Sequence, residues 1–119
     1  MIRGTTAQFK FKLPYPTWEF QDAVMTFWQP SNPNFGEPIK KKLEHCDSFN
    51  STSELCVSLS AEETARFSDR FKAKVQLRAL HVASGTIIGC TPQIVPVYPM
   101  FDALIKEELA PTTDSLDVV

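Results

Sequence analysis

The sequence predicts an all-β protein whose strands stack as an antiparallel β-sandwich, and three observations predict this fold class. Apolar residues recur at every second position through much of residues 1–98, which is the period of a strand with one buried face. Clusters of Pro, Asn, Ser and Gly separate these stretches. The chain has 119 residues, of which 43% are hydrophobic, and this suits a single hydrophobic core.

The first two strands are predicted at residues 8–13 and 22–29. In the first, Phe9 and Phe11 lie on one face only if the backbone is extended. The second is rich in aromatic and apolar residues over the length of a strand. Residues 30–38 combine Pro, Asn and Gly, and such a cluster is typical of a loop.

The third and fourth strands are predicted to pair with each other as a hairpin. Residues 39–45 alternate weakly and carry three consecutive lysines, which are typical of a solvated sheet edge. Residues 47–53 are polar and form the expected turn. Residues 55–60 then alternate again between apolar and polar side chains.

A short helix and a long strand are predicted next. Ser60 and Glu63 match a capping box, in which each side chain satisfies the backbone N–H group of the other residue. We expect a helix of about two turns from this point to Phe67. Residues 71–79 then show the clearest alternation in the chain and predict the longest strand.

A second hairpin is predicted at Ser84 and Gly85, because this turn pair stands between the long strand and the β-rich residues 86–90. Pro92 and Pro96 each remove a ladder donor in and beside residues 93–97. This confines them to a sheet edge or to short pieces of strand.

Residues 99–119 are predicted to form an acidic C-terminal arm, separate from the sandwich of residues 1–98. The arm contains one basic and five acidic residues, whereas residues 1–98 contain 11 basic and nine acidic residues. We expect it to be helical over residues 101–109, before Pro111, or extended. Its apolar side chains are expected to dock either on the core of the same chain or on a neighbouring subunit. These side chains are Phe101, Leu104, Ile105 and Leu109.

The composition argues against several classes of protein. The net charge of −2 lacks the basic footprint of a nucleic-acid binder. No stretch has the length of apolar residues that a signal peptide or a membrane span requires, so we expect no membrane partner. Three cysteines without a CxxC pair indicate neither a disulfide framework nor a zinc site. Four glycines exclude a Gly-rich phosphate loop, and we therefore expect no cofactor and no metal.

The sequence offers little support for an enzyme. His45 is next to Cys46, and adjacent residues of a strand point to opposite faces, so the two cannot form a dyad. His81 is expected at the rim of the sandwich. There it either meets Cys90 across a turn as a reactive dyad or is a partly buried histidine with hydrogen bonds. We expect the second arrangement and predict no catalytic residues.

The most distinctive residues are aromatic side chains beside prolines. Trp18 and Phe20 follow Pro-Tyr-Pro, and Tyr98 and Phe101 flank Pro99. Such rigidly presented rings are typical of anchors that bind a partner protein, and the alternative is that they cap the open ends of the sandwich. A carbohydrate- or receptor-binding module is a further possibility, with a ring of Trp18, Trp28 or Tyr98 presented for stacking.

The order of elements has the layout of a small immunoglobulin-like sandwich of about seven strands. The segments LCVSLSAEETA at residues 55–65, FKAKVQLRA at 71–79 and GTII at 85–88 resemble small structural proteins of tailed phages. They are notably similar to the immunoglobulin-like N-terminal domain of phage baseplate upper proteins. The opening IRGTT at residues 2–6 also resembles short prophage virion proteins.

This resemblance implies a non-enzymatic bacteriophage virion component in the head, neck or baseplate. Such a protein is made in the host cytoplasm and assembles through repeated contacts with other virion proteins. It forms homo-oligomers or is present in multiple copies. The resemblance carries no catalytic residues.

Overall fold

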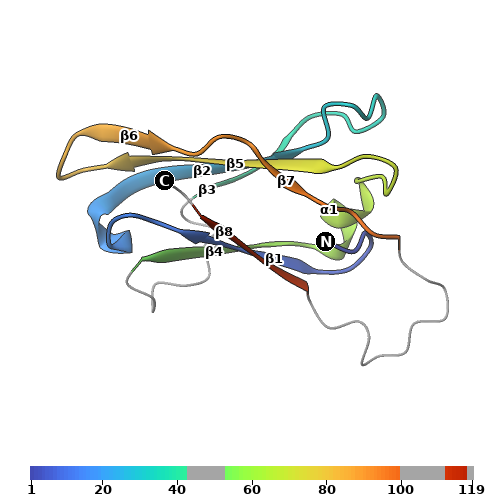
Figure 1. The fold of residues 1–119 in the computed structure, drawn as a ribbon, viewed down its shortest axis with the longest axis horizontal. Coiled ribbons are helices and arrows are strands. Elements are labelled where there is room, and N and C mark those ends of the chain that lie inside the picture. The colour runs from blue at the N-terminus through green and yellow to red at the C-terminus, as the bar shows by residue number, and fades with distance from the viewer. Residues whose placement is uncertain (43–52, 100–111, 118–119) are drawn as a thin grey trace.

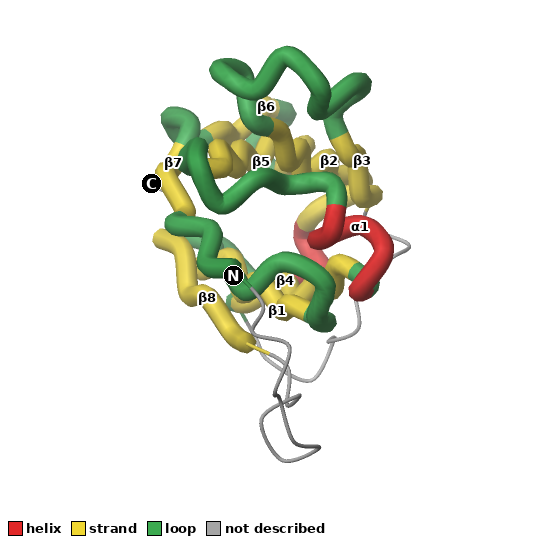
Figure 2. Tube along the Cα trace, turned by 90° about the vertical axis from the view of Figure 1, so that its right-hand side faces the viewer, coloured by secondary structure: helices red, strands yellow, loops and turns green. Residues whose placement is uncertain are grey.

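A computed structural model describes residues 1–42, 53–99 and 112–117 of the chain. Two β-sheets lie face to face, and the core fills the space between them (Figures 1 and 2). The smaller sheet has the order β4-β1-β8, and the larger has the order β3-β2-β5-β6, with β7 also paired to β5. The strands of the smaller sheet are β1 (Ala7–Lys12), β4 (Glu54–Leu59) and β8 (Thr112–Asp117). Those of the larger sheet are β2 (Phe20–Trp28), β3 (Ile39–Lys42), β5 (Ala73–His81), β6 (Thr86–Gly89) and β7 (Gln93–Val95).

The all-β fold predicted from the sequence is confirmed, and strand periodicity builds its core. Alternate residues of β1, β2, β4 and β5 are buried, as period-two patterning requires. The rings of Phe9 and Phe27, one from each sheet, meet with their centroids 4.9 Å apart. Each such fully buried aromatic or aliphatic side chain contributes about 1.5–3 kcal/mol to folding.

The predicted hairpin between the third and fourth strands is wrong. β3 pairs with β2, with Ile39 opposite Phe27, and β4 pairs with β1, with Leu59 opposite Ala7. The two strands therefore belong to different sheets. The reason lies in the apolar content of the two strands. β4 buries three side chains and needs a long apolar partner strand. In β3 only Ile39 is buried, which suits a strand at the edge of a sheet.

The sequence predicts that all three lysines of β3 lie on a solvated edge, but only two of them are exposed. Lys40 and Lys42 point away from the core, but Lys41 is half-buried and its Nζ lies 2.9 Å from the Glu63 carboxylate. This ion pair ties the edge of the larger sheet to the helix α1 (Ala61–Ala65), which follows β4.

The predicted capping box at the start of α1 is present. Ser60 Oγ accepts the Glu63 N–H, and the Glu63 carboxylate accepts the Ser60 N–H at 2.9 Å. Burial raises the pKa of Glu63, but the hydrogen bonds from Ser60 and the Lys41 ammonium outweigh burial, and the pKa falls below its ordinary value of 4.5. The helix is shorter than the two turns expected, and the Arg3 guanidinium binds the carbonyls of Ala65 and Phe67 at its end.

The second predicted hairpin, between β5 and β6, is confirmed. Gly85 in its turn has a φ of +67°, a left-handed conformation that favours glycine. β7 pairs with the first three residues of β5, and β6 pairs with the last four, so both lie along the same edge of β5. The expected short edge strand between the two prolines is therefore present as β7.

The smaller sheet contains the one parallel pair among the described strands. β8 runs parallel to β1, with Thr112 opposite Ala7, while the other seven strands pair antiparallel. Residues 112–117 of the expected arm are thus extended and docked on the core of this same chain, where Leu116 is buried. The expected helix at residues 101–109, with Phe101, Leu104, Ile105 and Leu109, lies outside the described residues.

Candidate functional site

An exposed tryptophan projects from one end of the sandwich, where β1 connects to β2. The connection contains the short 3-10 helix η1 (Thr17–Glu19), which begins after Pro16 and closes with a hydrogen bond from the Glu19 N–H to the Pro16 carbonyl. Thr17 is buried and fixes the turn, so the next side chain must point outward. Trp18 is 70% exposed, and Tyr15 is 40% exposed.

A buried histidine connects η1 to the β5–β6 hairpin. The His81 ring is stacked against the Tyr15 ring with centroids 3.9 Å apart, and only 3% of the residue is exposed. Its Nε2 lies 3.2 Å from Glu19 Oε1, and its Nδ1 lies 2.6 Å from Ser84 Oγ. The Val82 N–H also donates to the Glu19 carbonyl. These contacts make the connection and the hairpin one rigid unit.

We call the exposed large apolar side chains of this unit the aromatic end, defined as Tyr15, Trp18, Val82 and Ile87. Val82 is 56% exposed and Ile87 is 75% exposed. Large apolar side chains presented this way on a rigid support are the usual anchors of protein interfaces.

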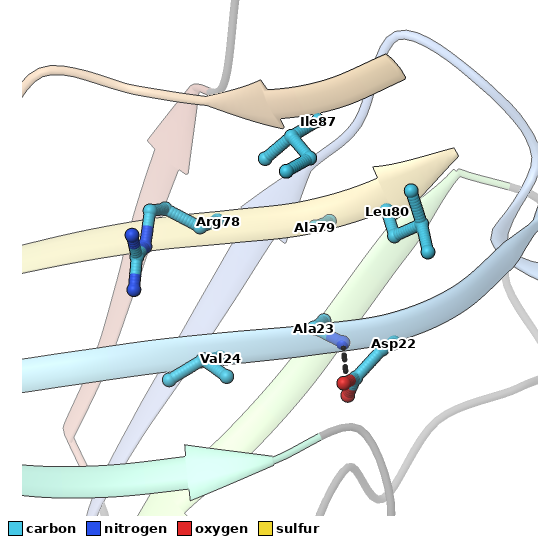
Figure 3. A pocket seen from close by; sticks show the side chains of 7 residues that line it. All are labelled: Asp22, Ala23, Val24, Arg78, Ala79, Leu80 and Ile87. Atoms are coloured by element: carbon cyan, nitrogen blue, oxygen red, sulfur yellow. Dashed lines mark hydrogen bonds between the residues drawn. The ribbon is translucent and has the colours of Figure 1, made fainter. Parts of the chain in front are cut away.

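A shallow hollow of about 300 Å³ adjoins Ile87 on the outer face of the larger sheet. Figure 3 shows Val24, Leu80 and Ile87 around it, from β2, β5 and β6. Arg78 and Asp22 lie at its margin and give the apolar floor a cation and an anion. The Asp22 carboxylate also accepts the Ala23 N–H at 2.8 Å. The hollow can accept one apolar side chain of a partner protein.

The His81 contacts place a hydroxyl, an imidazole and a carboxylate in sequence, which is the order of groups that activates a serine nucleophile. Here the Ser84 hydroxyl is shared with Thr86 Oγ1 at 2.6 Å, and Tyr15 covers the imidazole ring. Ser84 lines neither this hollow nor the hollow beside α1. The contacts connect the turn to Glu19 of η1. The only signal of them in the sequence was the spacing of His81 and Ser84 across the turn.

The alternative of a His81–Cys90 dyad is wrong. The Leu77 N–H donates to Cys90 Sγ at 3.3 Å, and the Cys90 N–H donates to the Leu77 carbonyl, so the thiol lies four residues along β5 from His81. His81 is instead the buried histidine with hydrogen bonds that the sequence favoured.

The remaining aromatic candidates do not gather at one site. Phe20 is 5% exposed and belongs to the core beneath Tyr15 and His81, so it is not a free anchor. Tyr98 is 55% exposed but lies at the opposite end of β1, where its backbone pairs with Ile2. Trp28 is half-buried and packs against the core. Phe101 is not among the described residues.

The structure describes residues 1–42, 53–99 and 112–117. Within these ranges, no group of three or more His, Cys, Asp or Glu side chains is placed to hold a metal ion. In the same part of the chain, no helix has the length and apolar character needed to span a membrane.

The fold and the site together define a small β-sandwich with an exposed aromatic end. Comparison with known proteins finds no match, either to a family model, to a curated protein or to a solved structure.

Proposed function

We propose that this protein is a non-enzymatic structural protein of a bacteriophage virion and joins its assembly through the aromatic end. The observation that carries the proposal is the exposure of Trp18, which is 70% exposed. Pro16, the turn η1 and the contact of His81 with Glu19 hold the backbone beneath it. The resemblance of residues 55–65 and 71–79 to small phage proteins supports the virion assignment.

The energetics of a docked tryptophan support this role. A tryptophan at the centre of an interface contributes about 2 kcal/mol or more, and its rigid support lowers the entropy lost on binding. A single contact of this size is weak, but a protein present in many copies adds such contacts. The expected partners are other virion proteins or further copies of this chain, and the expected location is the virion.

The test is incorporation into particles. A tagged wild-type chain and a Trp18→Ala variant are produced in a phage-bearing host, particles are purified on a gradient, and bound chain is counted by mass spectrometry. We expect the wild-type chain at a constant copy number and at least about tenfold less of the variant. Ile94→Ala, at a side chain that is 58% exposed on β7, is the matched control and should incorporate normally.

Two results would overturn the proposal. A wild-type chain that is absent from particles removes the virion assignment. A Trp18→Ala variant that incorporates as well as wild type removes the aromatic end from the interface.

A second candidate, carbohydrate or receptor binding, is favoured by one observation. The Trp18 ring is 70% exposed, and the neighbouring Glu19 carboxylate is linked through His81 to the hydroxyls of Ser84 and Thr86. An aromatic face beside hydrogen-bonding groups can stack on a sugar ring. Binding to a glycan array that Trp18→Ala abolishes would favour this candidate, and an array without signal would exclude it for the sugars present.

A further inference from the structure

Three arginines line a second hollow, beside α1. This hollow has a volume of about 440 Å³ and lies between residues 32–34 and residues 66–71. Arg3, Arg66 and Arg70 line it, and Asp69 is the one carboxylate in its wall. We call it the arginine hollow, defined by these three arginines. Its lining carries a net charge of +2 on a protein whose overall charge is −2.

The walls of the arginine hollow are held together by a buried glutamine. Gln29 is 2% exposed, and its amide donates to the carbonyls of Ser68 and Phe71 at 2.8 Å each. Its Oε1 accepts the Ser68 N–H and the Asn32 side-chain amide. Both donors and both acceptor positions of the side chain are therefore used, and the two segments are fixed before any ligand binds.

The guanidinium groups are oriented by the protein but are not neutralised by it. Arg3 donates to the carbonyls at the end of α1. Arg66 donates to the carbonyls of Phe35 and Glu37 and lies over the Phe35 ring at 4.8 Å. Among the described residues, no carboxylate forms an ion pair with any of the three arginines. Each retains N–H groups that can bind an oxyanion.

We propose that the arginine hollow binds the carboxylates of an extended acidic segment of a partner protein. The inference rests on the proposed function, because it assigns this partner to the same virion. Arg3 and Arg66 are anchored to different segments, so they suit several spaced negative charges better than one small anion. The overall acidic charge disfavours nucleic acid, which needs an extended basic track.

The test uses the full chain and a fluorescein-labelled hexaglutamate peptide as the probe, with fluorescence anisotropy as the readout. Arg70→Gln is the main variant, because its side chain makes no hydrogen bond within the described residues and the fold should not depend on it. We expect saturable binding, weakened about tenfold by Arg70→Gln. Lys40→Gln is the matched control, since Lys40 is an exposed cation on β3 outside the arginine hollow. It should bind like wild type.

Three outcomes would overturn this inference. Hexaglutamate that fails to bind, or that binds no better than hexaglutamine, excludes an acidic-peptide site. Equal loss in Arg70→Gln and Lys40→Gln would show general charge attraction. Oligothymidylate or inorganic phosphate that displaces the peptide at lower concentration would assign the hollow to those anions instead. Incorporation of wild-type chain and Trp18→Ala into particles is measured separately, so failure of peptide binding is distinguishable from failure of the virion assignment.

Discussion

Replacing Gln29 by leucine should destabilise the protein strongly, because one side chain connects two loops. In the native protein its amide makes four hydrogen bonds, to Ser68 N–H, to the Ser68 and Phe71 carbonyls and to the Asn32 amide. Leucine has a similar volume but can make none of these bonds. The backbone groups of Ser68 and Phe71 then lose their partner.

The magnitude follows from the number of bonds. A typical hydrogen bond contributes about 1 kcal/mol net, and a buried group left without a partner costs about 1–3 kcal/mol. Water can replace part of this loss because Ser68 and Phe71 are only half-buried. We therefore expect the free energy of unfolding to fall by about 2–4 kcal/mol, a large part of the 5–15 kcal/mol typical of a domain.

The assay is urea denaturation followed by the fluorescence of the two tryptophans. Gln76→Leu is the matched control, because Gln76 makes one hydrogen bond, to the Cys90 carbonyl at 3.0 Å. It should cost about 1 kcal/mol or less. If Gln29→Leu is no less stable than Gln76→Leu, the reasoning about the shared hydrogen bonds is wrong.

Three further predictions concern the helix, the turn and the reactive groups. Glu63→Gln should lower stability at pH 7 by about 1 kcal/mol. The pKa of Glu63 is lowered on folding. The stability difference between wild type and the variant is therefore complete above pH 4.5, the ordinary pKa of the group, and is lost as the pH falls through the native pKa. Gly85→Ala should cost about 1 kcal/mol in thermal unfolding, through the φ of +67° alone, since nothing lies within 4 Å of the added Cβ. A fluorophosphonate should not label Ser84, and a thiol probe should label Cys90 no faster than it labels the unfolded chain.

Each of these has a built-in comparison. Glu62→Gln removes a charge from the same first turn without touching the capping box, so an equal loss in both variants would contradict the assigned role of Glu63. Gly89→Ala adds a Cβ at ordinary contact distance, 3.5 Å from the Leu77 carbonyl, where φ is not left-handed. It should cost less than Gly85→Ala. Rapid labelling of Ser84 in the native protein would indicate an activated nucleophile and would contradict the non-enzymatic proposal.

The strands and the core were predictable because their signal is local. Burial at alternate positions needs only the sequence of one strand, and Phe9 and Phe11 show it plainly. The capping box of Ser60 and Glu63 is equally local. The prolines left two alternatives for the neighbouring aromatic residues, and the structure divides them: Trp18 is exposed, whereas Phe20 belongs to β2 and is buried.

The pairing of strands, the contacts of Gln29 and the strand β8 were not predictable in the same way. Adjacent strands were expected to form a hairpin, but β3 and β4 belong to different sheets. The position of Gln29 at the end of β2 carried no sign of its contacts with Ser68, 39 residues later in the chain. The sequence of β8, TTDSLD, has Leu116 as its one apolar residue, which is too little for a sequence pattern, and the strand pairs with β1.

The parallel pairing of β1 with β8 also affects how the protein is made. Ala7 and Thr112 are 105 positions apart (112 − 7), so β1 leaves the ribosome long before its neighbour exists. Until then one side of β1 carries unpaired backbone N–H and C=O groups, which attract strands of other nascent chains. A premature stop codon before residue 112 would make this state permanent. Its product would aggregate even though most of the core residues were already present.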